Sequence, residues 1–187
     1  PQGGWKRHGT VFDLDDSKSA ALILASSSST SSQHENHMFW GAGEIRHTTS
    51  EDARVWKEAG EVWLSVRKEP GWDSKGVESG PPPLRINSTG DWLFIYNAWD
   101  DQFVYKPGWV IMDGNDPSKI IQRSERPLFE PMWGWETGKE AFSCNVPNVV
   151  FVEAASEVAN QPDVFHVWYG AADSSIGSAL ITVLVQS

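Results

Sequence analysis

The chain has 187 residues and a formal net charge of −10 at pH 7, with 25 acidic side chains against 15 Lys and Arg. That length is enough for one domain with a sizeable core. The negative charge argues against nucleic acid and membrane surfaces as partners, since both are bound through clustered Lys and Arg. No uncharged apolar run is long enough to predict a transmembrane helix. The first residues, PQGGWKRHGT, are not typical of a signal peptide.

Short strands separated by Gly, Pro and Asn turns are predicted along almost the whole chain. The first two, at 20–26 and 37–43, flank a Ser-rich loop at 26–36 that we expect to be exposed and mobile. For 51–66 a short helix and a turn followed by a strand fit equally well, because Gly60 and β-branched residues interrupt the helical pattern.

Further strands are predicted before and after that ambiguous segment. In chain order they are a strand at 44–50, a hairpin at 83–99 with its loop at 87–90, a hairpin at 103–124 with its turn at 113–117, a pair at 148–155 and 164–172, and a last strand at 179–186. This regular spacing is typical of an all-β sandwich or propeller. A degenerate repeat, FWGAGEIRHTTSED and VWYGAADSSIGSALI, favours successive propeller blades.

The single cysteine and the tryptophans each have a plain structural interpretation. Cys144 can form no internal disulfide, and we expect it to be a buried small hydrophobe. Eleven tryptophans fit a Trp-rich β core, or the stacking of flat rings on sugars. Trp40, Trp99 and Trp168 are candidate stacking platforms, although we expect each of them in the core.

Three small motifs carry little functional weight. A calcium loop starting at Asp13 is rejected, because its sixth and twelfth places hold Lys18 and Leu24 instead of Gly and Glu. His34 and His37 lack a third metal ligand and are expected to be surface histidines in a polar loop. The sequon at Asn87 is a predicted N-glycosylation acceptor on a hairpin tip, and it supports secretion only weakly.

Asp173 follows the small-residue corner Gly-Ala-Ala between two apolar runs. One interpretation makes it a residue that caps a turn. The other makes it a ligand-facing acid, because the small corner leaves space for a ligand to approach closely.

Four segments resemble, in order and spacing, the later part of the glycoside hydrolase family 130 proteins. They are GPPPLRINSTGDWLFIYNAWD, VYKPGWVIMDGNDPSKIIQRSERPLFEP, NVPNVVF and WYGAADSSIG, and VPNVVF followed by YGAAD is the most specific pair. That family contains mannoside phosphorylases and β-mannosidases built on a five-bladed β-propeller. The resemblance implies an all-β fold in which residues 1–187 form the C-terminal portion, roughly the last three blades, of a single propeller domain. It also implies that the chain is a fragment or a processed subunit, whose missing N-terminal blades, with the aspartate that acts as general acid, would lie on a second polypeptide.

The resemblance further implies where a phosphate clamp would lie. Family phosphorylases are similar in carrying Arg, Lys, His and Tyr at four places that bind the phosphate. Here the Arg and Tyr places hold Arg7 and Tyr105, whereas the Lys place holds Gly76, with Lys75 one residue away, and the His place holds Asn97. The lost cations argue against a tight dianion site.

Glu78 stands where the phosphorylase pattern has glycine, and the hydrolytic members resemble this arrangement. Hydrolysis with inversion needs a carboxylate base about 6.5–9.5 Å from the acid, so Glu78 is the predicted catalytic base. The alternative is a solvated loop acid. By resemblance Asp173 accepts hydrogen bonds from sugar hydroxyls, Asn148 orients the pocket or ties a loop, and Glu44 is a weaker candidate at the equivalent corner.

The sequence therefore predicts a secreted, inverting glycoside hydrolase that acts on β-mannosides or mannose-containing oligosaccharides. The alternatives are a mannoside phosphorylase that releases a sugar 1-phosphate, a non-catalytic glycan-binding propeller, and a related five-bladed furanosidase. The expected partners are an oligosaccharide and the second polypeptide, with no cofactor and no metal. The residues expected to contact the saccharide are Asp173, Asn148, Tyr105, Arg7, Asn97, Glu44 and Lys75.

Overall fold

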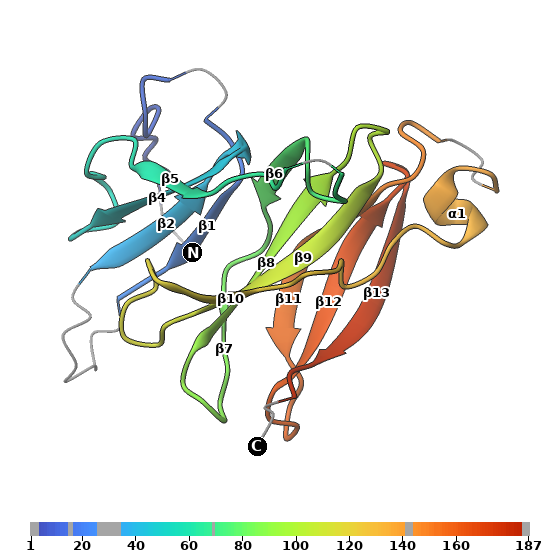
Figure 1. Cartoon of the computed structure of the whole chain (residues 1–187). Helices are drawn as coiled ribbons and strands as arrows, with labels where there is room; N and C mark the ends of the chain where they lie inside the picture. Colours follow the sequence, from blue (N-terminus) through green and yellow to red (C-terminus); the bar gives the residue numbers. More distant parts are fainter. Residues whose placement is uncertain (1–3, 15–16, 26–34, 69, 141–143, 185–187) are drawn as a thin grey trace.

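The computed structural model describes residues 4–14, 17–25, 35–68, 70–140 and 144–184, which form three antiparallel sheets (Figure 1). The first sheet has the order β1 (Ala20–Ile23), β2 (Asn36–Trp40), β4 (Ile45–Ser50), β5 (Glu61–Leu64). The second has the order β10 (Ile120–Arg123), β9 (Tyr105–Met112), β8 (Trp92–Trp99), β6 (Gly76–Ser79), β3 (Ala42–Gly43), with β7 (Leu84–Arg85) also on β8. The third has the order β11 (Val150–Glu157), β12 (Val164–Ala171), β13 (Ser175–Thr182). The prediction of an all-β fold is confirmed.

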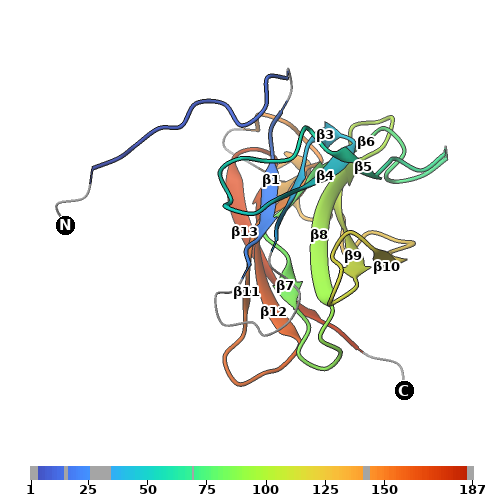
Figure 2. The same cartoon turned by 90° about the vertical axis from the view of Figure 1, so that its left-hand side faces the viewer.

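The sheets of the described residues are open and do not close into a ring (Figures 1 and 2). The predicted hairpins at 83–99 and 103–124 are present as β7–β8 and β9–β10, and the third pair as β11–β12. In the ambiguous segment the strand alternative holds, with bends at 51–55 followed by β5. Most of the Ser-rich loop, at 26–34, lies outside the described residues. Among those that are described, no helix has the length and apolar character to span a membrane.

Strand β8 connects the two hydrophobic cores of the molecule. Phe94, Tyr96 and Ala98 belong to the core between the first and second sheets, whereas Leu93 and Ile95 belong to the core between the second and third. Because successive side chains of a strand point to opposite faces, a strand buried on both faces is apolar at most of its positions. This explains the uninterrupted run WLFIY in the sequence.

The predictions of where three side chains lie are wrong: those for Cys144, for His37, and for Trp168, which is exposed instead of lying in the core. Cys144 is exposed instead of buried. His37 lies in β2 instead of a surface loop, and its Nδ1 atom is 2.9 Å from Nε2 of His47 on the neighbouring strand β4. Burial lowers the pKa of both rings, that of His47 to about 4, so both are neutral at pH 7.

The three candidate aromatic platforms differ in exposure. Trp40 is buried, as predicted, and stacks on Phe12 with ring centroids 4.6 Å apart. Trp99 is half-buried, whereas Trp168 is exposed on the outer face of β12.

A one-turn helix that was not predicted, α1 (Gly134–Thr137), is stabilised by the buried carboxylate of Glu136. Its Oε2 atom accepts hydrogen bonds from the backbone N–H groups of Met132 and Trp133, at 2.8 and 3.0 Å. Its Oε1 atom accepts one from the Tyr169 hydroxyl at 2.8 Å. Burial, together with this carboxylate, raises the pKa of Tyr169 to about 12.

A buried amide joins the second and third sheets. Asn97 on β8 is fully buried; its Nδ2 donates to the carbonyl of Val152 on β11 at 3.0 Å, and its Oδ1 accepts from the Val152 N–H at 2.7 Å. Asn97 has no exposed surface that a saccharide could contact. Its placement contradicts the substrate-binding role predicted for it and assigns it a structural one.

Replacing this amide should destabilise the fold. We expect Asn97→Ala to lower the free energy of unfolding by about 2–4 kcal/mol, because both backbone groups of Val152 lose a partner in a buried setting. Urea denaturation measures the change. The control is Asn115→Ala in the exposed β9–β10 turn, which should stay within about 0.5 kcal/mol of the parent chain. Equal effects of the two changes would contradict the role assigned to Asn97.

Candidate functional site

Three of the predicted site residues meet in one cavity of about 300 Å³ between β6, the start of β9 and the third sheet. Glu78, Tyr105 and Asp173 all line it, although they are far apart in the sequence. The complete lining is Lys18, Glu78, Tyr105, Val146, Val149, Phe151, Glu153, Gly170 and Asp173. We call it the carboxylate cavity.

Glu78 lies inside strand β6, between Ala42 on β3 and Asn97 on β8. Only 8% of its surface is exposed, so the alternative of a solvated loop acid is wrong. Its Oε1 accepts a hydrogen bond from the hydroxyl of Ser19 and lies 3.4 Å from Nζ of Lys18. A buried carboxylate needs such partners, because burial without them is costly. The catalytic role of Glu78 stays a prediction.

Tyr105 opens strand β9, and its ring stacks on Trp99, the register partner on β8, with centroids 5.0 Å apart. Burial raises the pKa of Tyr105, and the negative charges of Glu78 and Asp173 raise it further. Trp99 also explains the loss of one clamp place. A Cβ atom at Gly76 would lie 1.9 Å from the Trp99 ring, so a lysine at position 76 is incompatible with this packing.

Asp173 is at once a turn residue and part of the cavity lining. The N–H of Ser174 donates to the carbonyl of Ala171 at 3.0 Å, and the two residues between them, Ala172 and Asp173, have φ of 48° and 49°. These positive φ values match a type I′ turn, the kind that joins twisted strands. Nδ2 of Asn145 donates to the Asp173 carbonyl at 2.8 Å. Asp173 is therefore a turn residue that also lines the cavity, and its role as a ligand-facing acid stays a prediction.

Four other predicted residues lie outside the cavity lining. The carbonyl of Asn148 accepts the N–H of Tyr105 at 3.0 Å, so this residue ties a loop to β9. Glu44 is exposed at the corner between β3 and β4, and Lys75 is exposed just before β6. Arg7 is exposed on a segment without regular structure that extends away from the sheets (Figure 2). Their placement gives no support to the substrate-binding roles predicted for them.

Sequence reasoning missed two charged residues of the cavity. Glu153 carried a usable signal, since it is a lone charge inside the apolar run NVVFVEAA. Lys18 carried no signal in the sequence, because its contact with Glu78 forms only in the folded structure. Among the residues that the structure describes, no group of three His, Cys, Asp or Glu is arranged to hold a metal ion.

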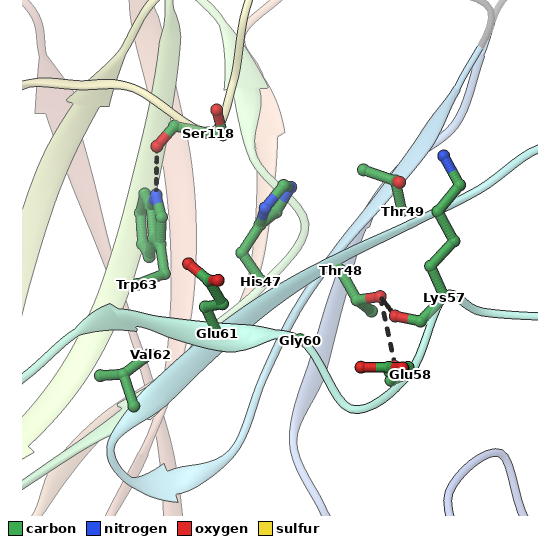
Figure 3. Close-up of a pocket in the computed structure, with 10 residues that line it drawn as sticks. All are labelled: His47, Thr48, Thr49, Lys57, Glu58, Gly60, Glu61, Val62, Trp63 and Ser118. Carbon is green, nitrogen blue, oxygen red and sulfur yellow. Dashed lines mark hydrogen bonds between the residues drawn. The ribbon is translucent and has the colours of Figure 1, made fainter.

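A larger cavity, of about 1000 Å³, lies between β4, β5 and the β9–β10 loop (Figure 3). The two cavities lie near opposite ends of β9. Ser118, which follows the strand, lines the larger cavity, and Tyr105, the first residue of the strand, lines the carboxylate cavity. Two polar side chains of the larger cavity bond to other lining residues: Trp63 Nε1 donates to the Ser118 carbonyl at 2.8 Å, and the Thr48 hydroxyl donates to the Lys57 carbonyl at 2.6 Å. None of the predicted site residues lines it, so the carboxylate cavity is the candidate site.

The electrostatic coupling inside the site can be measured directly. In Glu78→Gln we expect the pKa of Tyr105 to fall toward its ordinary value, because a negative charge that disfavours the tyrosinate is removed. NMR of ¹³Cζ-labelled tyrosine follows the titration, and the chain has only three tyrosines. Tyr96 and Tyr169 are internal controls, because other carboxylates act on them. An unchanged pKa of Tyr105 would show that the charge of Glu78 does not act on the Tyr105 hydroxyl.

Comparison with known proteins identifies the family. The glycoside hydrolase family 130 model, described as beta-1,4-mannooligosaccharide phosphorylase, matches residues 5–185. A 1,2-beta-oligomannan phosphorylase of Thermoanaerobacter sp. (strain X514) is 33% identical over 177 residues, which are 95% of this chain and 54% of the relative. A beta-1,2-mannobiose phosphorylase of the same organism is 41% identical over 110 residues, 59% of this chain and 33% of the relative. The chain thus spans about half, or less, of the length of these relatives.

Solved structures share the fold of this chain. The beta-1,2-mannobiose phosphorylase from Listeria innocua, in complex with beta-1,2-mannobiose, has a TM-score of 0.75 at 22% identity, over 90% of this chain and 45% of that one. A second structure comes from work on hydrolases within the family that target beta-1,2 mannosidic linkages in Candida mannan. It has a TM-score of 0.73 at 25% identity, over 96% of this chain and 55% of that one. The resemblance seen in the sequence motifs is confirmed: the chain belongs to glycoside hydrolase family 130, a family of carbohydrate-active enzymes.

Proposed function

We propose that this chain contributes the sugar-binding half of an enzyme that cleaves β-mannosides by phosphorolysis. The observation that carries the proposal is the meeting of Glu78, Tyr105 and Asp173 in one cavity of a family 130 chain. The sequence favoured hydrolysis and kept phosphorolysis as an alternative. We now place phosphorolysis before hydrolysis, because all four curated relatives are named phosphorylases.

In phosphorolysis an oxygen of phosphate attacks the anomeric carbon on the face opposite the leaving group. The bond to the leaving oxygen breaks, an acid gives that oxygen a proton, and a sugar 1-phosphate forms. Asp173 would accept hydrogen bonds from hydroxyls of the transferred sugar, and the Lys18 ammonium would attract the phosphate. We propose that the general acid lies on the part of the fold that this chain does not contain.

Hydrolysis is the second candidate, and the charge of the cavity favours it. Three carboxylates, Glu78, Glu153 and Asp173, line the cavity with a single cation, Lys18. A phosphate dianion entering this lining meets net repulsion, whereas water does not. In that mechanism Glu78 is the base that activates the water.

We also propose that the three sheets are roughly the last three blades of a five-bladed propeller, completed by N-terminal blades on a second polypeptide. Exposed apolar side chains on the outer side of β13 and just after it support this: Ile176, Leu180 and Leu184 are 81%, 65% and 83% exposed. Apolar patches of this kind on a sheet face favour a covering partner. The occupant we propose is another antiparallel sheet, since the relatives extend well beyond the part that this chain matches.

We also propose that the protein is secreted and carries a glycan on Asn87. Asn87 is exposed at the tip of the β7–β8 hairpin, where a glycan would have room. The loop is held by Asp163, whose Oδ1 accepts the Asn87 N–H at 2.6 Å, so the acceptor site is presented on an ordered turn.

The two chemistries differ in their need for phosphate and for Glu78. For the protein as isolated with its completing polypeptide, we expect β-1,2-mannobiose to yield mannose 1-phosphate only when phosphate is present. Glu78→Gln should keep this activity, because phosphate needs no base. Chromatography of the products measures both. Mannose released without phosphate, and lost by about 10²–10⁴-fold in Glu78→Gln, would establish hydrolysis instead. Binding without any turnover would establish the glycan-binding alternative.

The proposed contact face gives a separate prediction for the chain alone. The double change Ile176→Lys, Leu180→Lys should reduce self-association, because it removes exposed apolar surface, and leave the free energy of unfolding nearly unchanged. Light scattering and urea denaturation measure these quantities. Val167→Lys, on the buried side of the same sheet, should instead unfold the chain. Self-association that is unaffected by the double change would argue against this face as a docking surface.

A further inference from the structure

We infer that Glu153 is a second saccharide-binding carboxylate, one that accepts hydrogen bonds from sugar hydroxyls in the carboxylate cavity. The inference rests on the proposed function, from which it takes the class of ligand. Glu153 lines the cavity together with Glu78 and Asp173. Three features of the chain around Glu153 carry the assignment: its position on the cavity-facing side of β11, the glycine beside it, and the lack of a protein partner for its carboxylate.

Strand alternation points Glu153 into the cavity, because Val149, Phe151 and Glu153, at every second position of the chain, all line it. On β11 the register with β12 runs Val152 opposite Tyr169 and then Ala154 opposite Trp168, so Glu153 is the extra residue that has no partner. Bulges are over-represented next to active sites. Val152, between Phe151 and Glu153, is buried in the core, and the regular alternation breaks only after Glu153, where Ala154 is exposed as well.

Gly170 on β12 leaves room beside the carboxylate. A Cβ atom at this position would lie 3.5 Å from Oε1 of Glu153 and 3.9 Å from its Cδ. These are ordinary contact distances, so the carboxylate lies over the glycine without strain. Any longer side chain at position 170 would occupy space that is now open to a ligand, since Gly170 itself lines the cavity.

Glu153 is exposed, and its carboxylate oxygens are available to a ligand. Over the described ranges of the chain, Glu153 makes no side-chain hydrogen bond or ion pair, whereas Glu78 in the same cavity contacts Lys18 and Ser19. An ionised carboxylate only accepts hydrogen bonds, and two neighbouring sugar hydroxyls supply two donors. Such charge-assisted bonds are among the stronger ones. A phosphate at this place would be repelled, so the ligand group beside Glu153 is a neutral sugar ring.

The test is a binding comparison on the protein as isolated, with β-1,2-mannobiose as the probe and calorimetry as the measurement. We expect Glu153→Ala to weaken binding about 10-fold or more, the equivalent of one lost charge-assisted hydrogen bond, and Glu153→Gln to weaken it less. Gly170→Ala should also weaken binding, because its methyl group narrows the cavity. The matched control is Glu157→Ala, an exposed residue at the far end of the same strand, which should bind like the parent. Circular dichroism confirms that each variant is folded.

The outcomes separate this inference from the proposed function. Unchanged affinity in Glu153→Ala, with weakened binding in Asp173→Ala, would overturn the role of Glu153 and leave the proposed function standing. An equal loss in Glu157→Ala would also overturn it, because the effect would then come from general charge. If the parent protein binds no β-mannoside, the proposed function fails, and the ligand class given to Glu153 fails with it.

Discussion

The geometry of the candidate site depends on one buried amide. Asn97 lies opposite Glu78 in the β6–β8 register, and its side chain holds both backbone groups of Val152. Val152 directly precedes Glu153, so the same amide links the strand of one cavity carboxylate to the strand of the other. An unpaired backbone group is costly in a buried setting, and the two sheets therefore cannot slide past one another without a large penalty. The spacing between Glu78 and Glu153 follows from this constraint.

Features set by local sequence could be predicted, because turn chemistry and alternation act over a few residues. The hairpin loop at 87–90, the turn at 113–117 and the Gly-Ala-Ala corner before Asp173 all occur where Gly, Asn, Asp and Pro mark them. Segment 51–66 was ambiguous because its residues fit two periods, and pairing of β5 with β4 decided it. Local pattern thus fixes the elements, and tertiary pairing settles those that the pattern leaves open.

The contacts that build the site could not be predicted, because each joins residues far apart in the sequence. Lys18 and Ser19 reach Glu78 only through the stacking of the first and second sheets. The structural use of Asn97 was hidden for the same reason: an amide suits a sugar as well as it suits a peptide group. A lone Cys144 has no spacing pattern to interpret, and its exposure depends on how the loop before β11 lies. Family motifs marked three residues that line one cavity, but not the partners of their side chains.

Whether phosphate or water attacks the sugar depends on the ammonium group of Lys18, for which a bound phosphate would compete with Glu78. The segment that carries Arg7 leads away from the sheets (Figure 2), so Lys18 is the one cation in the lining of the described cavity. Its Nζ lies 3.4 Å from Oε1 of Glu78, and a bound phosphate must draw it from that carboxylate or share it. Phosphate is also repelled by Glu153 and Asp173, whereas water meets no such opposition. The proposed phosphorolysis therefore requires further cations at the cavity, beyond Lys18.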